Sequence, residues 1–218
     1  MRSDIKLFNM DCMDALREME TNAFDLAIVD PPYGINQDRV QNELGGKKGF
    51  NKESGTFKQY HKTNWDDSVP TKEYFNELFR VSKNQIIWGG NYFFTLDLSG
   101  VIIWNKGNSG KFKEGEFAKT SFNTFKLFYY SRADAYINKI DMKIHPTQKP
   151  VALYKWLLKN YAKEGDSILD THLGSGSIAL ACHDAGYDLT GYELDEDYFK
   201  AALHRLGEHK KQGQFEFA

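Results

Sequence analysis

Alternating strand and helix patterns near the end of the chain restrict the fold more than any other feature. The stretch SILDTHLGSGSIALACHDAGYDLTGYELD begins at Ser167 with an apolar run, passes through a glycine-containing turn and continues as a helix-like run over 178–185. A second apolar run over 187–192 ends at Glu193, and a helix is expected over 197–206. Strands that alternate with helices predict a doubly wound α/β sheet.

Weaker patterns elsewhere fit the same fold class. Strands are expected over 5–8, 24–29, 85–88, 101–104 and 124–130, and helices over 12–19, from Thr71 onward, and from Pro150 to a stop at Gly165. The chain of 218 residues, 41% of them hydrophobic, suits one domain over 1–218. The segment 34–64 is rich in Gly, Asn, Gln and Lys, and predicts a long flexible loop.

The glycine turn has the features of a nucleotide site. Gly174 and Gly176 allow a tight turn and a close approach of the backbone to a ligand, and the following helix begins with unpaired N–H groups. Glu193 lies 23 residues after Asp170, where a carboxylate can accept hydrogen bonds from a ribose. The spacing matches neither GxGxxG nor a P-loop, so a ligand with a ribose and no phosphate, such as S-adenosylmethionine, fits better. An ordinary strand-to-helix turn is the alternative.

A stiff corner follows the expected strand over 24–29. The run Asp30-Pro31-Pro32-Tyr33 combines a carboxylate, two residues with fixed φ and an aromatic ring. A surface turn would explain the prolines. A binding clamp would explain all four residues, because it needs an acceptor, rigid carbonyls and a stacking surface at fixed positions.

Composition excludes several classes of protein. No apolar run is long enough to span a membrane, and the start MRSDIKLFNMD lacks a signal-peptide pattern. Two cysteines, Cys12 and Cys182, argue against a disulfide scaffold, and no Cys/His spacing predicts a metal site. A cytoplasmic location is the simplest expectation. The net charge of −2 does not indicate a nucleic-acid binder, although 39–63 carries six basic and two acidic residues.

Three motifs occur in an informative order: DPPY at 30–33, HPTQKP at 145–150, and DTHLGSGS at 170–177 with ELD at 193–195. Together they resemble the amino-methyltransferases of DNA, in the subgroup whose catalytic half precedes the cofactor half. The strings IKLFNMDCMDAL, NWDDSVP, IIWGGNYF and VIIWNKG extend the resemblance over about 5–206. It implies a Rossmann-like, mostly parallel sheet with one reversed strand, helices on both faces and a permuted motif order.

The resemblance also implies a cofactor, S-adenosylmethionine, and a set of residues that bind it. Asp11 would contact the adenine amino group of the cofactor, Cys12 would lie beside that adenine, and Lys149 would lie near the methionine carboxylate. A solvated acid, a buried cysteine and a surface lysine are the respective alternatives. The full implied set is Asp11, Cys12, Asp30, Lys149, Asp170, His172, Gly174, Ser175, Gly176 and Glu193.

For the DPPY corner the resemblance implies catalysis at the N6 amino group of adenine. Asp30 and the Pro31 carbonyl would accept the two amino hydrogens, which draws the nitrogen lone pair out of conjugation. Pro32 would stiffen the corner, because misplacement by about 1 Å can cost roughly 100-fold in rate. Tyr33 would stack on the target base, which reaches the corner only when flipped out of the duplex.

Two features leave alternatives open. An Asp at the first motif position favours adenine, but cytosine N4 or RNA as the substrate remains an alternative. Thr171 and His172 stand where the family commonly has Pro-Phe, which is the one feature that favours a degenerate nucleic-acid-binding protein with this fold. His145 is interpreted as structural.

Double-stranded DNA is the partner that the resemblance implies, and the segment 108–144 is expected to recognise its target. Within that segment, Phe125 and Phe128 are expected in the core. The resemblance further suggests a homodimer, a restriction–modification or an orphan, phage-like setting, and a cognate endonuclease in the first case. The lysines expected to contact DNA are Lys47, Lys48, Lys52, Lys58, Lys62, Lys111 and Lys113.

Overall fold

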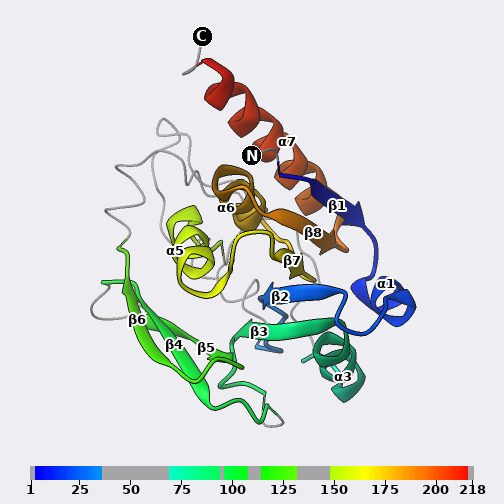
Figure 1. Ribbon diagram of the computed structural model, residues 1–218, viewed down its shortest axis with the longest axis vertical. Helices are drawn as coiled ribbons and strands as arrows, with labels where there is room; N and C mark the ends of the chain where they lie inside the picture. The colour runs from blue at the N-terminus through cyan, green and yellow to red at the C-terminus, as the bar shows by residue number, and fades with distance from the viewer. Residues whose placement is uncertain (1–2, 36–68, 94–95, 108–113, 132–147, 216–218) are drawn as a thin grey trace, which may run out of the picture.

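The computed structural model describes residues 3–35, 69–93, 96–107, 114–131 and 148–215. Within these ranges one sheet of eight strands carries helices on both faces (Figure 1). In chain order the elements are β1 (Ile5–Asn9), α1 (Cys12–Glu18), β2 (Phe24–Val29), α3 (Lys72–Val81), β3 (Ser82–Trp88), β4 (Gly100–Asn105), β5 (Gly115–Thr120), β6 (Phe125–Tyr129), α5 (Val151–Tyr161), β7 (Ser167–Asp170), α6 (Ser177–Ala185), β8 (Asp188–Glu193) and α7 (Glu196–Phe215).

The strand order across the sheet is β1-β8-β7-β2-β3-β5-β4-β6. Strand β5 runs antiparallel to both of its neighbours, β3 and β4. All other neighbouring strands in the described residues pair in parallel. The expected α/β class, with a mostly parallel sheet and one reversed strand, is confirmed.

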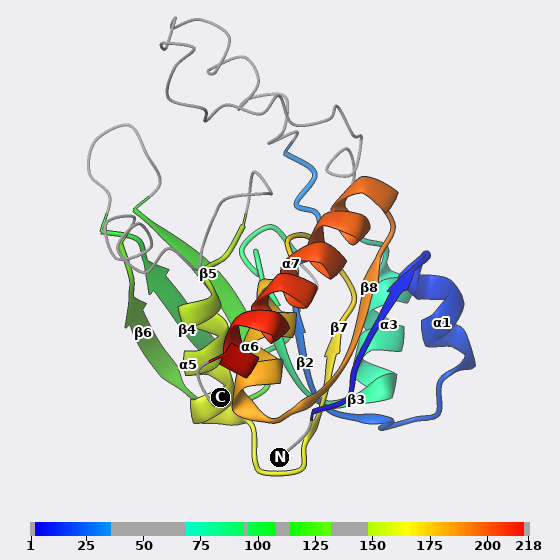
Figure 2. The same ribbon diagram turned by 90° about the horizontal axis from the view of Figure 1, so that it is seen from above.

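Two apolar cores form on the two faces of the sheet. Alternate residues of the central strands pack with α5, α6 and α7 on one face, and these helices lie in front of the sheet in Figure 2. The intervening residues pack with α1 and α3 on the other face. Along β2, for example, Leu26 and Ile28 face the first core, whereas Ala27 and Val29 face the second. A strand buried on both faces reads as a continuous apolar run, as this one does.

Local capping sets several element boundaries as expected. The Thr71 hydroxyl accepts a hydrogen bond from the Tyr74 N–H at 3.2 Å, which caps α3. The helix after Pro150 ends at Tyr161 rather than at Gly165, because Ala162 is already extended there. Helix α7 continues to Phe215, beyond the expected end at residue 206.

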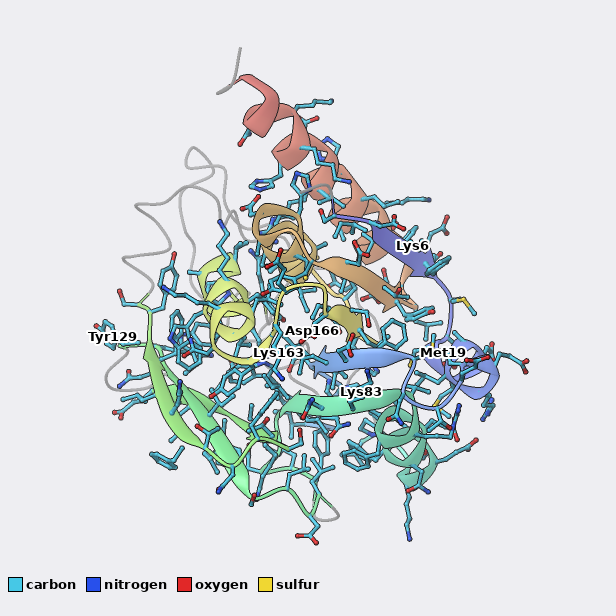
Figure 3. The ribbon with its side chains drawn as sticks, in the orientation of Figure 1. Lys6, Met19, Lys83, Tyr129, Lys163 and Asp166 are labelled. Carbon is cyan, nitrogen blue, oxygen red and sulfur yellow. The ribbon has the colours of Figure 1, made fainter. Side chains whose placement is uncertain are left out.

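The expectation that both Phe125 and Phe128 lie in the core is half wrong. Phe128 packs against Trp156 of α5, with ring centroids 5.2 Å apart, and is confirmed as a core contact. Phe125 is 74% exposed, because β6 is an edge strand and its alternate residues face away from α5. Tyr129, on the same face of β6, is labelled at the outer edge of Figure 3.

Strands β2 and β7 are neighbours from which the chain leaves in opposite directions. From β2 it passes through α3 to β3, and from β7 it passes through α6, on the other face, to β8. Such a topological switch point is where open α/β sheets bind ligands, outside the carboxyl ends of the strands. Asp30 follows β2 and Asp170 ends β7, so both motifs meet at this point.

Candidate active site

The Asp30-Pro31-Pro32-Tyr33 corner directly follows β2. Asp30 has both carboxylate oxygens engaged inside the protein. The Tyr33 hydroxyl donates to Oδ1, and the Lys149 ammonium donates to Oδ2. Lys149 comes from the segment before α5, so the fold brings two motifs that are 119 residues apart into contact. The acceptor expected to hold an amino group is therefore preorganised by two donors.

Lys149 is the buried member of a row of alternating charges whose other members are partly exposed. Its side chain is 2% exposed, and its Nζ lies 3.1 Å from Glu116 Oε2 as an ion pair without the alignment of a hydrogen bond. The other Glu116 oxygen pairs with Lys106. The Trp88 ring lies under the Lys149 ammonium, 5.2 Å from Nζ to the ring centroid. A buried charge is tolerated when it is paired in this way.

The row shifts the pKa values of its members. Burial raises the pKa of Asp30, and the Lys149 charge only partly opposes that effect. Burial acts to lower the pKa of Lys149, but Asp30 and Glu116 outweigh it and raise that pKa above its usual value. Burial also acts to raise the pKa of Glu116, whereas Lys149 and Lys106 hold it at about 2. Lys149 and Glu116 are therefore both charged at neutral pH.

The Tyr33 ring lies on a surface made by β3 and the turn that follows it. It stacks on Tyr92, with centroids 4.9 Å apart and planes 14° apart. Gly89 has φ +71°, and a Cβ there would lie 2.1 Å from Tyr33 Cε1. The double glycine after β3 thus leaves room for the ring that the DPPY motif supplies.

The glycine turn after β7 is held by Glu193 from the end of β8. Glu193 Oε2 accepts the Gly174 N–H at 2.7 Å, and Oε1 accepts the Asp195 N–H at 2.9 Å. Gly176 has φ +70°, and a Cβ there would lie 2.9 Å from the Cβ of Ala202 on α7. The turn therefore needs glycine for its conformation and for helix packing. Ser175, also in the turn, is 5% exposed.

Asp170 is 1% exposed, and its Oδ1 accepts the His172 N–H at 3.0 Å. Burial raises the pKa of Asp170 to about 8. Next to it, His172 Nδ1 lies 2.8 Å from the Thr171 hydroxyl oxygen, which lies 2.7 Å from the Tyr74 hydroxyl oxygen. Burial lowers the pKa of His172 to about 4, so its ring is neutral at pH 7.

Asp11 and Cys12 follow β1, the edge strand that pairs with β8. Asp11 caps α1, because its Oδ1 accepts the Met13 N–H at 2.8 Å. Burial raises the pKa of Cys12 to about 12, so its thiol is not a reactive nucleophile at neutral pH.

The parallel strands bring these groups to one edge of the sheet. Asp11, Asp30 and His172 follow β1, β2 and β7, and Glu193 ends β8; the carboxyl ends of these four strands meet at that edge. A glycine turn, a carboxylate after the next strand and no Gly-Lys-Ser/Thr sequence fit a nucleoside ligand without a phosphate. Across the described ranges, no group of three or more His, Cys, Asp or Glu side chains could hold a metal ion.

Several residues named from the sequence fall in other parts of the chain. His145 and the seven lysines expected to contact DNA lie outside the described residues. Part of the expected recognition segment, 108–144, is described, and it contributes β5 and β6 to the sheet. None of the helices in the described ranges has the length and apolar character needed to span a bilayer.

Sequence reasoning missed Glu116, Lys106 and Tyr92. Glu116 lies on β5, a strand without an apolar run, so no local pattern marks it. Tyr92 follows the double glycine, and its aromatic character was the one signal that could have indicated a stacking partner for Tyr33.

The fold is that of the S-adenosylmethionine-dependent DNA methyltransferases. It is similar to the structure titled M1.HpyAVI-SAM complex, with a TM-score of 0.60 and 17% identity over 92% of this chain and 99% of that chain. It is also similar to the PvuII DNA methyltransferase, described as cytosine-N4-specific, with a TM-score of 0.57 and 11% identity over 94% and 87% of the two chains.

The sequence comparisons point to the N6/N4 DNA amino-methyltransferases. Residues 126–204 match a family model described as DNA methylase. The chain is 24% identical to the type II methyltransferase M.HpaI of Haemophilus parainfluenzae, over 93% of this chain and 74% of that one. It is 23% identical to M2.DpnII of Streptococcus pneumoniae, over 92% and 88%. These matches establish distant homology to type II DNA methyltransferases, in agreement with the resemblance seen in the motifs.

Proposed function

We propose that the chain is a DNA methyltransferase that uses S-adenosylmethionine and acts on the N6 amino group of adenine. The observation that carries this proposal is the meeting of two motifs at the switch point of the sheet. The Asp30 corner follows β2, and the glycine turn held by Glu193 follows the neighbouring strand β7. This neighbourhood supports a pairing of an amino-group acceptor with a nucleoside site.

The residues present fit the cofactor. Gly174 and Gly176 both have the positive φ of a tight glycine turn, and Glu193 and Asp11 offer carboxylates at the ends of β8 and β1. When bound, S-adenosylmethionine would supply a methyl group on a positively charged sulfur: an N–C bond to the target amino nitrogen would form as the C–S bond breaks, with S-adenosylhomocysteine as the leaving group and one amino proton released. Lys149 as a partner of the methionine carboxylate stays a prediction, and its contacts in the structure are with Asp30 and Glu116.

The Asp30 carboxylate would be the main catalytic group of the protein. With the Pro31 carbonyl it accepts the two hydrogens of the target amino group, which localises the nitrogen lone pair for attack. In the structure Asp30 Oδ1 accepts a hydrogen bond from the Tyr33 hydroxyl. An incoming amino group would replace that hydroxyl as the donor. Tyr33 would then stack on the flipped base. Lys149 stays on Oδ2 and keeps the carboxylate in position.

Adenine is favoured over cytosine by the Asp at the first position of the DPPY motif. The likeness to a cytosine-N4-specific enzyme is one of fold, so cytosine N4 remains the second candidate. The DNA contacts of the predicted lysines, a homodimer and a cognate endonuclease stay predictions of the same proposal.

The test is direct. The protein is incubated with unmethylated duplex DNA and S-adenosylmethionine, and the DNA is digested to nucleosides for mass spectrometry. We expect N6-methyladenine, and we expect Asp30→Ala to reduce its formation by about 100-fold or more while cofactor binding persists. Asp14→Ala is the control, because Asp14 is an exposed acid on α1.

Each other outcome has a defined meaning. N4-methylcytosine as the product would keep the cofactor and the fold but overturn the base assignment. Full activity of Asp30→Ala would overturn the mechanism. A wild-type protein that binds the cofactor yet modifies no base in DNA would overturn the substrate assignment, and RNA would be tested next.

A further inference from the structure

A chain of hydrogen bonds runs from the core to the candidate cofactor site. The Tyr74 hydroxyl on α3 lies 2.7 Å from Thr171 Oγ1, and Thr171 Oγ1 lies 2.8 Å from His172 Nδ1. Tyr74 and Thr171 are each 3% exposed, whereas His172 is partly exposed. The Tyr74 and His172 rings also meet edge to face, with centroids 5.4 Å apart.

Burial fixes the direction of this chain. Within the described residues, Thr171 Oγ1 is the acceptor that the buried Tyr74 hydroxyl can reach. Tyr74 therefore donates to Thr171, since a buried hydroxyl hydrogen without an acceptor is costly. The Thr171 hydroxyl has one hydrogen, and it donates that hydrogen to His172 Nδ1. A neutral imidazole that accepts at Nδ1 carries its own hydrogen on Nε2.

The ring position determines where that hydrogen is offered. His172 comes two residues after the end of β7 and two residues before Gly174, at the switch point. Nδ1 is turned toward the buried Thr171, and Nε2 lies on the opposite side of the imidazole. No described residue forms a hydrogen bond with Nε2. The Nε2–H group of the neutral His172 ring is thus a hydrogen-bond donor close to the glycine turn.

We propose that His172 binds the cofactor directly, by donating a hydrogen bond from Nε2 to a polar acceptor of S-adenosylmethionine. Tyr74 and Thr171 are positioning residues that set the tautomer of the ring. This assignment rests on the proposed function. The Phe that resembling enzymes commonly carry at this position could pack against a cofactor but could not donate a hydrogen bond to it.

Two variants of His172 distinguish a hydrogen bond to the cofactor from simple packing of a flat ring against it. His172→Phe keeps a flat ring but removes the donor, and His172→Gln places an amide N–H near the position of Nε2. We expect His172→Phe to weaken the affinity for S-adenosylhomocysteine, measured by calorimetry, by roughly 5- to 10-fold. We expect His172→Gln to retain most of the affinity, within about 3-fold of wild type.

A second measurement reads the tautomer without any ligand. In protein labelled with ¹⁵N-histidine, the His172 shifts should report a bare Nδ1 and a protonated Nε2. Tyr74→Phe should reduce this preference, because the Thr171 hydroxyl is then free to accept as well as to donate. Tyr161→Phe, which removes a hydroxyl from α5, is the matched control and should leave the His172 shifts unchanged.

The ligand set locates the acceptor. If 5′-methylthioadenosine shows the same loss with His172→Phe, the donor contacts the nucleoside part of the cofactor. If only S-adenosylhomocysteine shows the loss, the donor contacts the amino-acid part. Both results support the assignment.

Three results would overturn it. Equal affinities of wild type and His172→Phe for both ligands would refute the proposed hydrogen bond from His172 to the cofactor. The proposed function would be left intact. A proton on Nδ1 in the wild-type protein would refute the direction of the chain. A folded wild-type protein that bound neither ligand would refute this inference together with the proposed function.

Discussion

At the scale of single residues, Gly89 decides where Tyr33 can lie. Its φ of +71° is unfavourable for other residues, and a Cβ would lie 2.1 Å from the Tyr33 ring. The DPPY motif supplies the aromatic ring, but a glycine more than fifty residues later makes room for it. Tyr33 was therefore predictable from its motif, whereas its stacking surface was not.

We expect Gly89→Ala to move the Tyr33 ring. It should therefore lower the rate of methyl transfer well below that of the control variant. Gly165→Ala is the matched control, because Gly165 has φ +86° and a Cβ added there would meet no atom within 4 Å. Both variants bear the cost of a positive φ, about 1 kcal/mol, but only Gly89→Ala adds the clash. Equal effects of the two variants on activity and on melting temperature would contradict this role.

At the scale of elements, two arginines link α1 and α3, and Arg80 is the less exposed of the two. Arg80 near the end of α3 donates to the Met19 carbonyl at 2.6 Å and to the Leu16 carbonyl at 2.7 Å. Leu16 lies in the last turn of α1 and Met19 caps the helix, at the end where helix carbonyls lack i+4 partners. Glu77 holds the guanidinium in place, 2.6 Å from Nη2.

We expect Arg80→Met to lower the free energy of unfolding by about 1–3 kcal/mol, because both carbonyls lose the guanidinium donor and only the Leu16 carbonyl keeps another, the Met19 N–H. Arg17→Met is the control, since Arg17 pairs with Glu73 at the exposed surface and such pairs contribute little. Urea unfolding of both variants measures the difference. An Arg80→Met protein as stable as the Arg17→Met protein would show that the contact is dispensable.

The elements themselves were predictable to different degrees. The bounds of β2 and β7 follow from apolar runs that are buried on both faces, and the structure confirms them. Strand β5 was missed because its sequence, GEFAKT, mixes charged and small residues. Pairing with β3 and β4 on both sides makes it a strand, and that is a property of the sheet rather than of the segment.

At the scale of the whole molecule, Lys149 connects three distant parts of the chain. It pairs with Asp30 after β2 and with Glu116 on β5, from its own position before α5. Removing this one cation leaves two partly buried carboxylates with less compensation, and that is costly.

We expect Lys149→Met to lower the free energy of unfolding by about 3–5 kcal/mol. Lys155→Met is the control, because Lys155 is 44% exposed and its ion pair with Asp184 lies at the surface. Thermal unfolding at neutral pH measures both variants. A melting temperature for Lys149→Met that matches the control would show that Asp30 and Glu116 do not depend on this lysine.

Local sequence patterns were enough to predict the fold class, the DPPY corner and the glycine turn. These features depend on neighbours along the chain: apolar periodicity, fixed proline φ angles and glycines that adopt positive φ. The contacts of Lys149 with Asp30 and Glu116, and of Tyr74 and Thr171 with His172, became visible only in the folded molecule. Most of these contacts join residues far apart in sequence, so they depend on the strand order of the sheet, which no local pattern encodes.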